Sequence, residues 1–293
     1  MPRVLIVGCG FVGEAAADRF HATGWETSAW TGSAESAARL GAEKPYPVAA
    51  CDVTDPDTVA RLAGTIPPLD VLVMGVSSGR GGGPEQYRRV YLGGARNLAA
   101  AFRPAKFVYT GSTSVYAQTD GAWLDESAPT VPDRETGRVL LATEEVVLAA
   151  PGGTVARLAG IYGPGRSVLL KKFLAGEAVV EGDGGRWLNQ IHRDDAATAL
   201  LRLAQPDAPP GVYNVADDQP LTQLALYTAL AAHFGRPLPP SGPVDLNRKR
   251  GWTSKRIANT HLRALGWRPA YPSFLDWTSD QPPGTDSRSV SVP

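Results

Sequence analysis

A run of glycines near the amino terminus has the spacing of a phosphate-binding turn. The segment Gly8-Cys9-Gly10-Phe11-Val12-Gly13 fits the pattern G-x-G-x-x-G. In that pattern the first glycine permits a tight turn, the second lets backbone N–H groups approach a pyrophosphate, and the third lets a helix pack closely on a strand. An ordinary glycine turn is the alternative. If a strand precedes the motif and a helix follows it, we expect Gly8, Gly10, Phe11, Val12 and Gly13 to bind a dinucleotide.

A histidine and two arginines form a second group that could support chemistry. His192 and Arg193 are adjacent in the chain, and an imidazole beside a guanidinium could donate a proton or bind an anionic substrate. A hydrogen-bonded structural histidine explains the pair about as well. Arg166 lies on a glycine-rich loop, where its guanidinium would suit a carboxylate or a phosphate. His192 is thus a candidate catalytic residue, and Arg166 and Arg193 are candidate substrate contacts.

The end of the second strand should meet the adenosine ribose, about 20 residues after the glycine motif. The segment 30–33 contains no Asp or Glu, and an acid there would bind the 2′-hydroxyl of NAD and repel the 2′-phosphate of NADP. Thr31 and Ser33 are hydrogen-bond donors at this place. The sequence therefore favours NADP, but it does not exclude NAD because no arginine stands there either.

An alternation of apolar strands and helices must position these residues. Residues 4–7 form a continuous aliphatic run, typical of a strand buried on both faces of a parallel sheet, and residues 14–23 read as the helix that follows. The pattern predicts an α/β fold, a Rossmann-type doubly wound parallel sheet of about seven strands with a smaller C-terminal lobe. Further strands are expected at 27–30, 47–51, 71–74, 106–109, 154–157 and 212–215, and further helices at 34–40, 58–64, 87–102, 137–150, 196–204, 223–234 and 255–265.

The chain divides by composition near residue 162. Residues 1–162 are expected to form an NAD(P)-binding domain, to which a helix near 196–204 and a strand near 212–215 return. Residues 163–280 are interrupted often by glycine and proline, which indicates a smaller substrate-binding lobe built from insertions. Residues 281–293 contain three prolines, four Ser or Thr and no apolar period, which predicts a disordered tail.

Charge and apolar patterning argue against several classes of partner. Twenty-nine Lys and Arg balance 29 Asp and Glu, so we expect neither nucleic acid nor an anionic membrane as a partner. No apolar run approaches the ~20 residues that span a bilayer, and no signal peptide is recognisable, so a cytoplasmic protein is expected. Cys9, Cys51 and the four histidines show no metal-ligand spacing, so no metal is expected.

Five segments in one order resemble a known family, the extended short-chain dehydrogenase/reductases, which are similar to NAD-dependent epimerases and dehydratases. The resemblance runs nearly to residue 280. Its motifs are the glycine turn, Cys51-Asp52-Val53, Gly75-Val76-Ser77, Thr110-Gly111-Ser112-Thr113-Ser114-Val115-Tyr116, and Arg157-Leu158-Ala159-Gly160-Ile161-Tyr162-Gly163-Pro164-Gly165-Arg166.

The resemblance implies roles for the residues after each strand. Asp52 would accept a hydrogen bond from the adenine amino group, Val53 would pack on the adenine, and Gly75, Val76 and Ser77 would line the ribose and nicotinamide. Ser112 matches a serine that hydrogen-bonds a substrate hydroxyl or carbonyl, and Ser114 would contact the substrate. The alternative is that both serines satisfy their own backbone at a strand end.

The expected catalytic pair is missing at its usual place. The family's Tyr and Lys, four residues apart, align with Thr136 and Leu140, although Glu144 fits the pattern. The segment Asn189-Gln190-Ile191-His192-Arg193-Asp194-Asp195 resembles an atypical branch of the family in which that pair is also absent. A proton must then come from another group, and Tyr116 and His192 are the nearest candidates. Tyr116 could equally be a core aromatic.

Two functions follow from these residues. The favoured one is an NAD(P)-dependent oxidoreductase or epimerase-like enzyme that acts on a small polar substrate, either sugar-like or anionic, by a non-standard proton transfer, with a family-like homodimer as a further expectation. The alternative is a non-catalytic dinucleotide-binding sensor or scaffold. An open space beside the nicotinamide would favour the enzyme, and a filled one the sensor.

Overall fold

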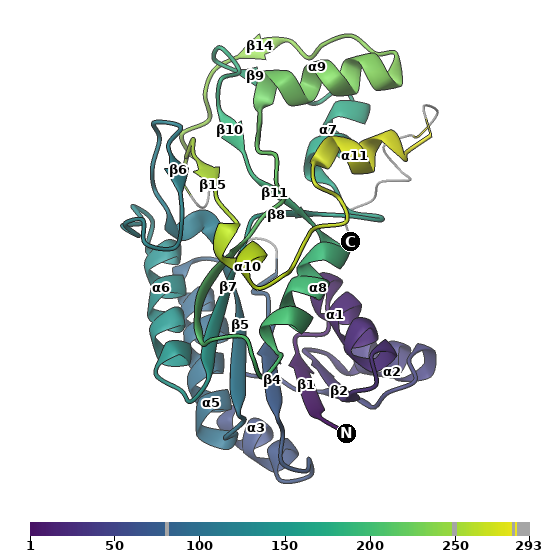
Figure 1. Ribbon diagram of the computed structural model, residues 1–293, viewed down its shortest axis with the longest axis vertical. Coiled ribbons are helices and arrows are strands. Elements are labelled where there is room, and N and C mark those ends of the chain that lie inside the picture. Colours follow the sequence, from purple (N-terminus) through teal and green to yellow (C-terminus); the bar gives the residue numbers. More distant parts are fainter. Residues whose placement is uncertain (80–81, 248–250, 283–284, 286–293) are drawn as a thin grey trace.

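A seven-stranded parallel sheet forms the centre of the molecule (Figure 1). The computed structural model describes residues 1–79, 82–247, 251–282 and 285. The strand order is β3-β2-β1-β4-β5-β7-β12, so the chain reverses direction across the sheet between β1 and β4, which confirms the doubly wound fold. The strands are β1 (Arg3–Val7), β2 (Glu26–Thr31), β3 (Val48–Ala50), β4 (Val71–Met74), β5 (Lys106–Ser112), β7 (Gly153–Leu158) and β12 (Gly211–Val215).

The central strands are buried because both of their faces are apolar. Residues 4–7 of β1 are at most 1% exposed, and all four residues of β4 are buried. Helices α1, α2 and α8 cover one face of the sheet, and α3, α5 and α6 cover the other (Figure 1). These helices are α1 (Phe11–Ala22), α2 (Ala34–Glu43), α3 (Pro56–Ala63), α5 (Gly94–Ala101), α6 (Glu135–Leu148) and α8 (Arg193–Leu203).

The long helix expected at 87–102 begins earlier and is not uniform. It starts as α4 (Pro84–Tyr87), continues through a π-helical stretch (Arg88–Gly93) and ends as α5. Proline at the first helical position suits this earlier start, because its missing N–H would have no partner there.

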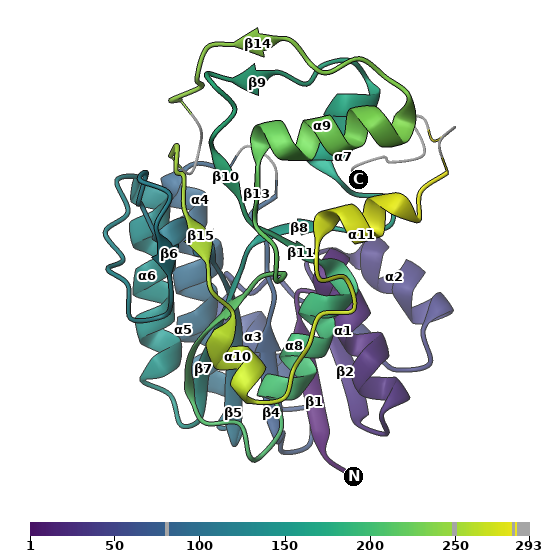
Figure 2. The same cartoon turned by 45° about the horizontal axis from the view of Figure 1, so that its top comes forward.

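A smaller lobe lies over the carboxyl ends of the strands (Figures 1 and 2). Its own core contains Tyr162, Phe173, Leu226, Phe274 and Trp277. The lobe's helices are α7 (Val168–Leu174), α9 (Gln223–Phe234) and α11 (Phe274–Ser279). Short paired strands complete the upper part: β6 (Trp123–Leu124) with β15 (Arg256–Ile257), β8 (Gly160–Tyr162) with β11 (Gln190–His192), β9 (Val180–Glu181) with β14 (Ser241–Gly242), and β10 (Trp187–Leu188) with β13 (Leu221–Thr222).

The prediction of a single helix over residues 255–265 is wrong. The segment instead forms β15, which pairs with β6, and then the short helix α10 (Thr260–Ala264). Asn189 explains the difference, because its amide nitrogen donates to the Lys255 carbonyl (2.8 Å) and its amide oxygen accepts from the Ile257 N–H (2.8 Å). Backbone groups held this way are not available to a helix. Ile257 packs into the core of the sheet domain and not into the lobe's own core.

The expected tail lies mostly outside the described residues, since 283–284 and 286–293 are not described. The chain before it is well anchored. Ser273 and Asp276 form a reciprocal capping box at the start of α11.

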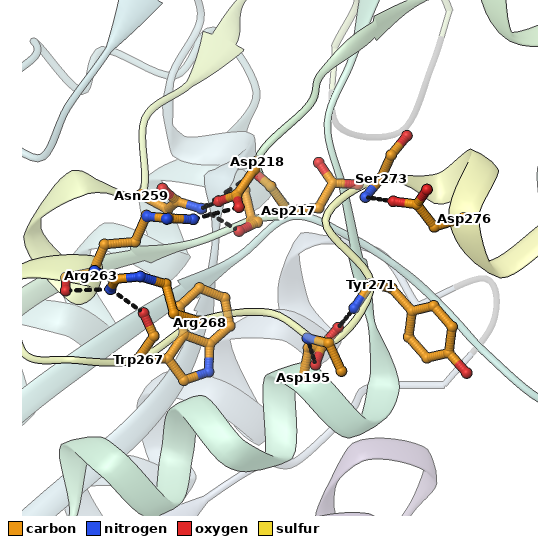
Figure 3. Close-up of polar contacts among 12 residues, drawn as sticks. Asp195, Asp217, Asp218, Asn259, Arg263, Trp267, Arg268, Tyr271, Ser273 and Asp276 are labelled. Carbon is orange, nitrogen blue, oxygen red and sulfur yellow. Dashed lines mark hydrogen bonds and ion pairs between the residues drawn. The ribbon is translucent and has the colours of Figure 1, made fainter.

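Polar side chains tie this carboxyl-terminal return to the sheet domain (Figure 3). The Asp195 carboxylate, 2% exposed, accepts from the backbone N–H groups of Ala270 (2.7 Å) and Tyr271 (3.0 Å). Asn259 donates to the Ala216 carbonyl (2.9 Å) and to Asp218 (2.8 Å), which also pairs with Arg263. The return segment is thereby attached to both α8 and the end of β12.

Removing the Asp195 carboxylate should destabilise the protein. Asp195→Ala leaves two part-buried N–H groups without an acceptor, so we expect its free energy of unfolding in urea to fall by about 1–3 kcal/mol. Asp195→Asn keeps one acceptor and should lose less. Asp194→Ala removes a neighbouring carboxylate that is 42% exposed and paired with Arg193, and should cost less than about 1 kcal/mol. Equal losses at the two positions would contradict this account.

Candidate active site

The glycine turn between β1 and α1 is shaped by close backbone approaches. Gly8 has φ +96°, and a Cβ on it would lie 2.5 Å from the backbone carbon of Gly75. A Cβ on Gly13 would lie 2.1 Å from the Gly8 carbonyl oxygen. Both positions therefore exclude side chains for reasons internal to the fold.

Gly10 differs from the other two glycines because a Cβ there would meet no atom within 4 Å. Its backbone is extended, and it begins the 12-residue helix α1 without a side-chain cap. The first N–H groups of a helix lack intrahelical partners and carry partial positive charge. An open space at this helix end is what a bound pyrophosphate requires.

A cavity of about 270 Å³ opens directly in front of this turn. It lies where the chain order reverses between β1 and β4, the place at which doubly wound sheets bind ligands. We call it the first cavity. Eight of the residues expected in the site meet here: Gly10, Phe11, Val12, Gly75, Val76, Ser77, Ser112 and Arg166.

Two arginines lie over the Phe11 ring at the mouth of the turn. The guanidinium carbons of Arg166 and Arg193 are 5.0 and 5.3 Å from its ring centre. Arg193 also pairs with Asp194 (2.9 Å). Both cations lie beside the glycine turn, and neither lines the second cavity described below. Their role as substrate contacts stays a prediction.

The residues expected around the adenosine lie outside the first cavity. Asp52 accepts from the Thr54 N–H (2.9 Å), and Val53 is 7% exposed beside α5. Ser33 caps α2 by accepting from the Ser36 N–H (3.2 Å), while Thr31 ends β2. Their roles toward adenine and ribose stay predictions.

A second, polar cavity of about 330 Å³ adjoins the first. The two share Ser112, Ala159 and Gly160, which lie at the ends of β5 and β7. The second cavity is further lined by Ser114, Arg186, Trp187, Asn189, Gln190, Thr253 and Lys255, among others. A ligand spanning both cavities would pass Ser112.

The two candidate serines have different surroundings. The Ser112 hydroxyl accepts from the Ser114 N–H (3.2 Å) at the end of β5. The Ser114 hydroxyl oxygen is buried and has no hydrogen-bond partner in the described part of the chain. A buried hydroxyl without a partner costs free energy unless a ligand or water satisfies it, so Ser114 is suited to contact a substrate.

Tyr116 is not placed to act as the acid. Its side chain is 0% exposed, and its hydroxyl accepts from Arg157 (2.8 Å) and donates to Asn214 (2.9 Å). Burial raises the pKa of its phenol, against the lowering effect of Arg157. The alternative, a core aromatic with a satisfied hydroxyl, describes Tyr116 better.

His192 is also turned away from both cavities. It is 2% exposed and caps α8, with Nδ1 accepting from the Asp194 N–H (3.2 Å). Its ring lies 4.4 Å from that of Tyr271 and 5.3 Å from that of Tyr162. Burial lowers its pKa to about 4, so the imidazole is neutral at neutral pH. A structural histidine fits these contacts.

The two positions aligned with the family's Tyr and Lys lie on α6. Leu140 lines the first cavity, and Thr136 is 5% exposed. Glu144, on the same helix, forms a buried ion pair with Arg157 (2.6 Å). The structure therefore puts an apolar side chain in the first cavity at position 140.

Sequence reasoning missed Lys255 and Arg186, two cations that line the second cavity. Lys255 fell at the start of a helix that does not form. Arg186 stands in a glycine-rich segment without a recognisable motif. Asn189 and Gln190, which line the same cavity, belong to the segment that resembles the atypical branch, so the sequence did draw attention to them.

The fold and the glycine turn define a protein of the Rossmann class, and comparisons with known proteins narrow this further. A model of the NAD dependent epimerase/dehydratase family matches residues 4–216. Protein YeeZ of Escherichia coli (strain K12) is 30% identical over 288 residues, which cover 94% of this chain and 98% of YeeZ. The chain belongs to the NAD dependent epimerase/dehydratase family.

Solved structures of similar proteins agree with this fold. A candidate NAD-dependent epimerase/dehydratase from Methylobacillus flagellatus is 30% identical, with a TM-score of 0.75 and coverage of 94% of this chain and 95% of that one. UDP-glucose 4-epimerase of Thermus thermophilus, solved in complex with NAD, is 23% identical, with a TM-score of 0.77 and coverage of 94% and 96%.

Two features are absent from the residues that the structure describes. No helix in them is long and apolar enough to cross a membrane. No group of three or more His, Cys, Asp or Glu side chains in them could hold a metal ion.

Gly10→Val should separate ligand binding from folding. A Cβ there meets no protein atom within 4 Å, and a valine would fill the space in front of α1, so we expect an unchanged melting temperature and a loss of dinucleotide affinity of at least about 100-fold, or about 2.7 kcal/mol. Isothermal titration with NADP and NAD measures the affinity.

Two further variants serve as controls. Gly41→Val adds the same side chain in α2, where a Cβ also meets nothing within 4 Å, and should bind normally. Gly13→Val should fail to fold, because its side chain would collide with Gly8. Undiminished binding by Gly10→Val would remove the glycine turn from the site.

Proposed function

We propose that the protein is an NAD(P)-dependent enzyme of the oxidoreductase or epimerase type, with a small polar substrate bound in the second cavity. The observation that carries this proposal is the junction of the two cavities at Ser112. A dinucleotide whose pyrophosphate lies at Gly10 and whose nicotinamide points toward Ser112 would leave the second cavity open for a substrate.

The protein's own residues would bind and orient the two ligands. The N-terminus of α1 would hold the pyrophosphate, with Arg166 and Arg193 supplying positive charge beside Phe11. The Ser112 hydroxyl would orient a substrate oxygen, and the Ser114 hydroxyl would gain the partner that it lacks. The nicotinamide, when bound, supplies hydride transfer.

Charge also limits the substrate class. Lys255 and Arg186 both line the second cavity, so a substrate with carbonyl, hydroxyl or anionic oxygens suits it better than an apolar one. This agrees with a sugar-like or anionic substrate. A homodimer stays a prediction.

The non-catalytic sensor keeps one observation in its favour, because Tyr116 and His192 are both buried away from the cavities. The open second cavity favours the enzyme. A screen of small carbonyl compounds with NADPH and of nucleotide sugars with NADP distinguishes the two. We expect the wild type either to consume NADPH with a carbonyl compound or to convert a nucleotide sugar into an epimer that NMR of the products detects, and Ser112→Ala to be slower by about 100-fold or more. Tight dinucleotide binding without any turnover would favour the sensor.

The cofactor is proposed to be NADP. The end of β2 offers hydroxyls at Thr31 and Ser33 and no carboxylate, and Glu35, the first acid after the strand, is exposed in the first turn of α2. Isothermal titration of the wild type should give tighter binding for NADP than for NAD. Binding of NAD tenfold tighter, about 1.4 kcal/mol, would overturn this preference.

A further inference from the structure

Lys255 is the buried cation whose position the fold defines most closely. Its segment is clamped on two sides: Ser254 bonds through its backbone to Gln118 and Gly121, and Asn189 holds the Lys255 carbonyl. The side chain is 3% exposed and lines the second cavity.

The Lys255 ammonium has only neutral hydrogen-bond partners in the described chain. Its Nζ donates to the Tyr116 carbonyl (2.7 Å) and to the Thr253 hydroxyl (3.0 Å). An ammonium has three N–H donors, so these bonds leave one for a ligand. Ser114, whose buried hydroxyl has no partner in the described residues, lines the same cavity.

Charge around Lys255 disfavours its protonated form. Burial, and then the positive charge of Arg186, lower the pKa of Lys255 to about 7. Arg186 itself lies against the Glu181 carboxylate (3.8 Å) and donates to the Thr253 carbonyl (3.0 Å). Arg157 donates to the Tyr116 hydroxyl and forms a buried ion pair with Glu144. This pair has no net charge, so it does not favour either protonation state of Lys255. Lys255 therefore has both protonation states available near neutral pH.

A purely structural lysine would look different. Lys106, at the opposite end of β5, is 8% exposed, and its Nζ donates to the carbonyls of Leu203 and Ala208. It lines neither of the two cavities. Lys106 supports the fold, whereas Lys255 has a similar degree of burial beside a polar space that no residue fills.

Resting on the proposed function, we propose that Lys255 is a catalytic residue that exchanges a proton with the substrate oxygen in the second cavity, next to Ser112 and Ser114. In the reducing direction a substrate carbonyl carbon takes up hydride from the reduced nicotinamide, the C=O π bond breaks, and the oxygen takes a proton from the ammonium. The resulting neutral amine regains a proton from water. In the oxidising direction the neutral amine accepts the hydroxyl proton as hydride leaves for the oxidised nicotinamide.

Trace labelling of the wild-type protein with acetic anhydride tests this assignment without a known substrate. Peptide mass spectrometry reports each lysine separately, and the chain has six: Lys44, Lys106, Lys171, Lys172, Lys249 and Lys255. Only the neutral amine reacts. At pH 7 roughly half of the Lys255 side chains should be neutral, against roughly one in three thousand for an ordinary lysine. We expect the labelling midpoint of Lys255 near pH 7, well below that of an ordinary lysine.

The dinucleotide supplies the second arm of the test. With NADPH at about ten times its Kd, Lys255 should still be labelled, because the dinucleotide occupies the first cavity and leaves the second one open to the reagent. Lys106 and Lys172 are the controls and should be unaffected. A Lys255 midpoint above pH 9, or loss of Lys255 labelling when NADPH binds, would overturn the role of Lys255.

Calorimetry on the same samples distinguishes failure of the Lys255 role from failure of the proposed function. If NADPH binds but Lys255 fails either labelling criterion, the role of Lys255 fails and the dinucleotide site stands. If NADPH does not bind, the proposed function fails, and the role of Lys255 fails with it. Lys255→Met should bind NADPH as the wild type does and lose the labelled peptide, which verifies the assignment of the signal.

Discussion

The contact between the Gly8 turn and Gly75 determines where a ligand can bind. A Cβ on Gly8 would lie 2.5 Å from the Gly75 backbone, so any larger residue would force β1 and β4 apart. Because the turn stays close to β4, the N-terminus of α1 and the end of β4 face one cavity. In the proposed arrangement Gly10 would meet the pyrophosphate in the middle of a dinucleotide, and Ser112, at the end of β5, would meet its nicotinamide.

The two buried cations beside Tyr116 show how the fold distinguishes structure from chemistry. Arg157 is neutralised by Glu144 at 2.6 Å and also bonds the Tyr116 hydroxyl. Lys255 bonds the carbonyl of the same tyrosine, and its hydrogen-bond partners in the described residues are neutral oxygens. Burying a cation without a carboxylate costs stability, and such costs gather at functional sites. Tyr116, expected to be an acid, instead bonds Arg157 through its hydroxyl and Lys255 through its backbone carbonyl.

Local patterns predicted the sheet domain well. The aliphatic run of β1, the glycine turn and the alternation with helices depend on short-range spacing, so much of the lining of the first cavity could be anticipated. The second cavity could not be predicted in this way. Its wall combines the end of β5 with Arg186 and Lys255, which are far apart in the sequence, and the side chain of Asn189 overrides the helical pattern after Lys255.

A structure of the protein with NADP bound would test the account's central claim most directly. We predict that the pyrophosphate lies at Gly10 and the nicotinamide ring contacts Ser112, within roughly 4.5 Å, while the cavity beside Lys255 stays open. A nicotinamide ring outside the first cavity, or a ring that fills the space beside Lys255, would contradict the proposed arrangement of cofactor and substrate.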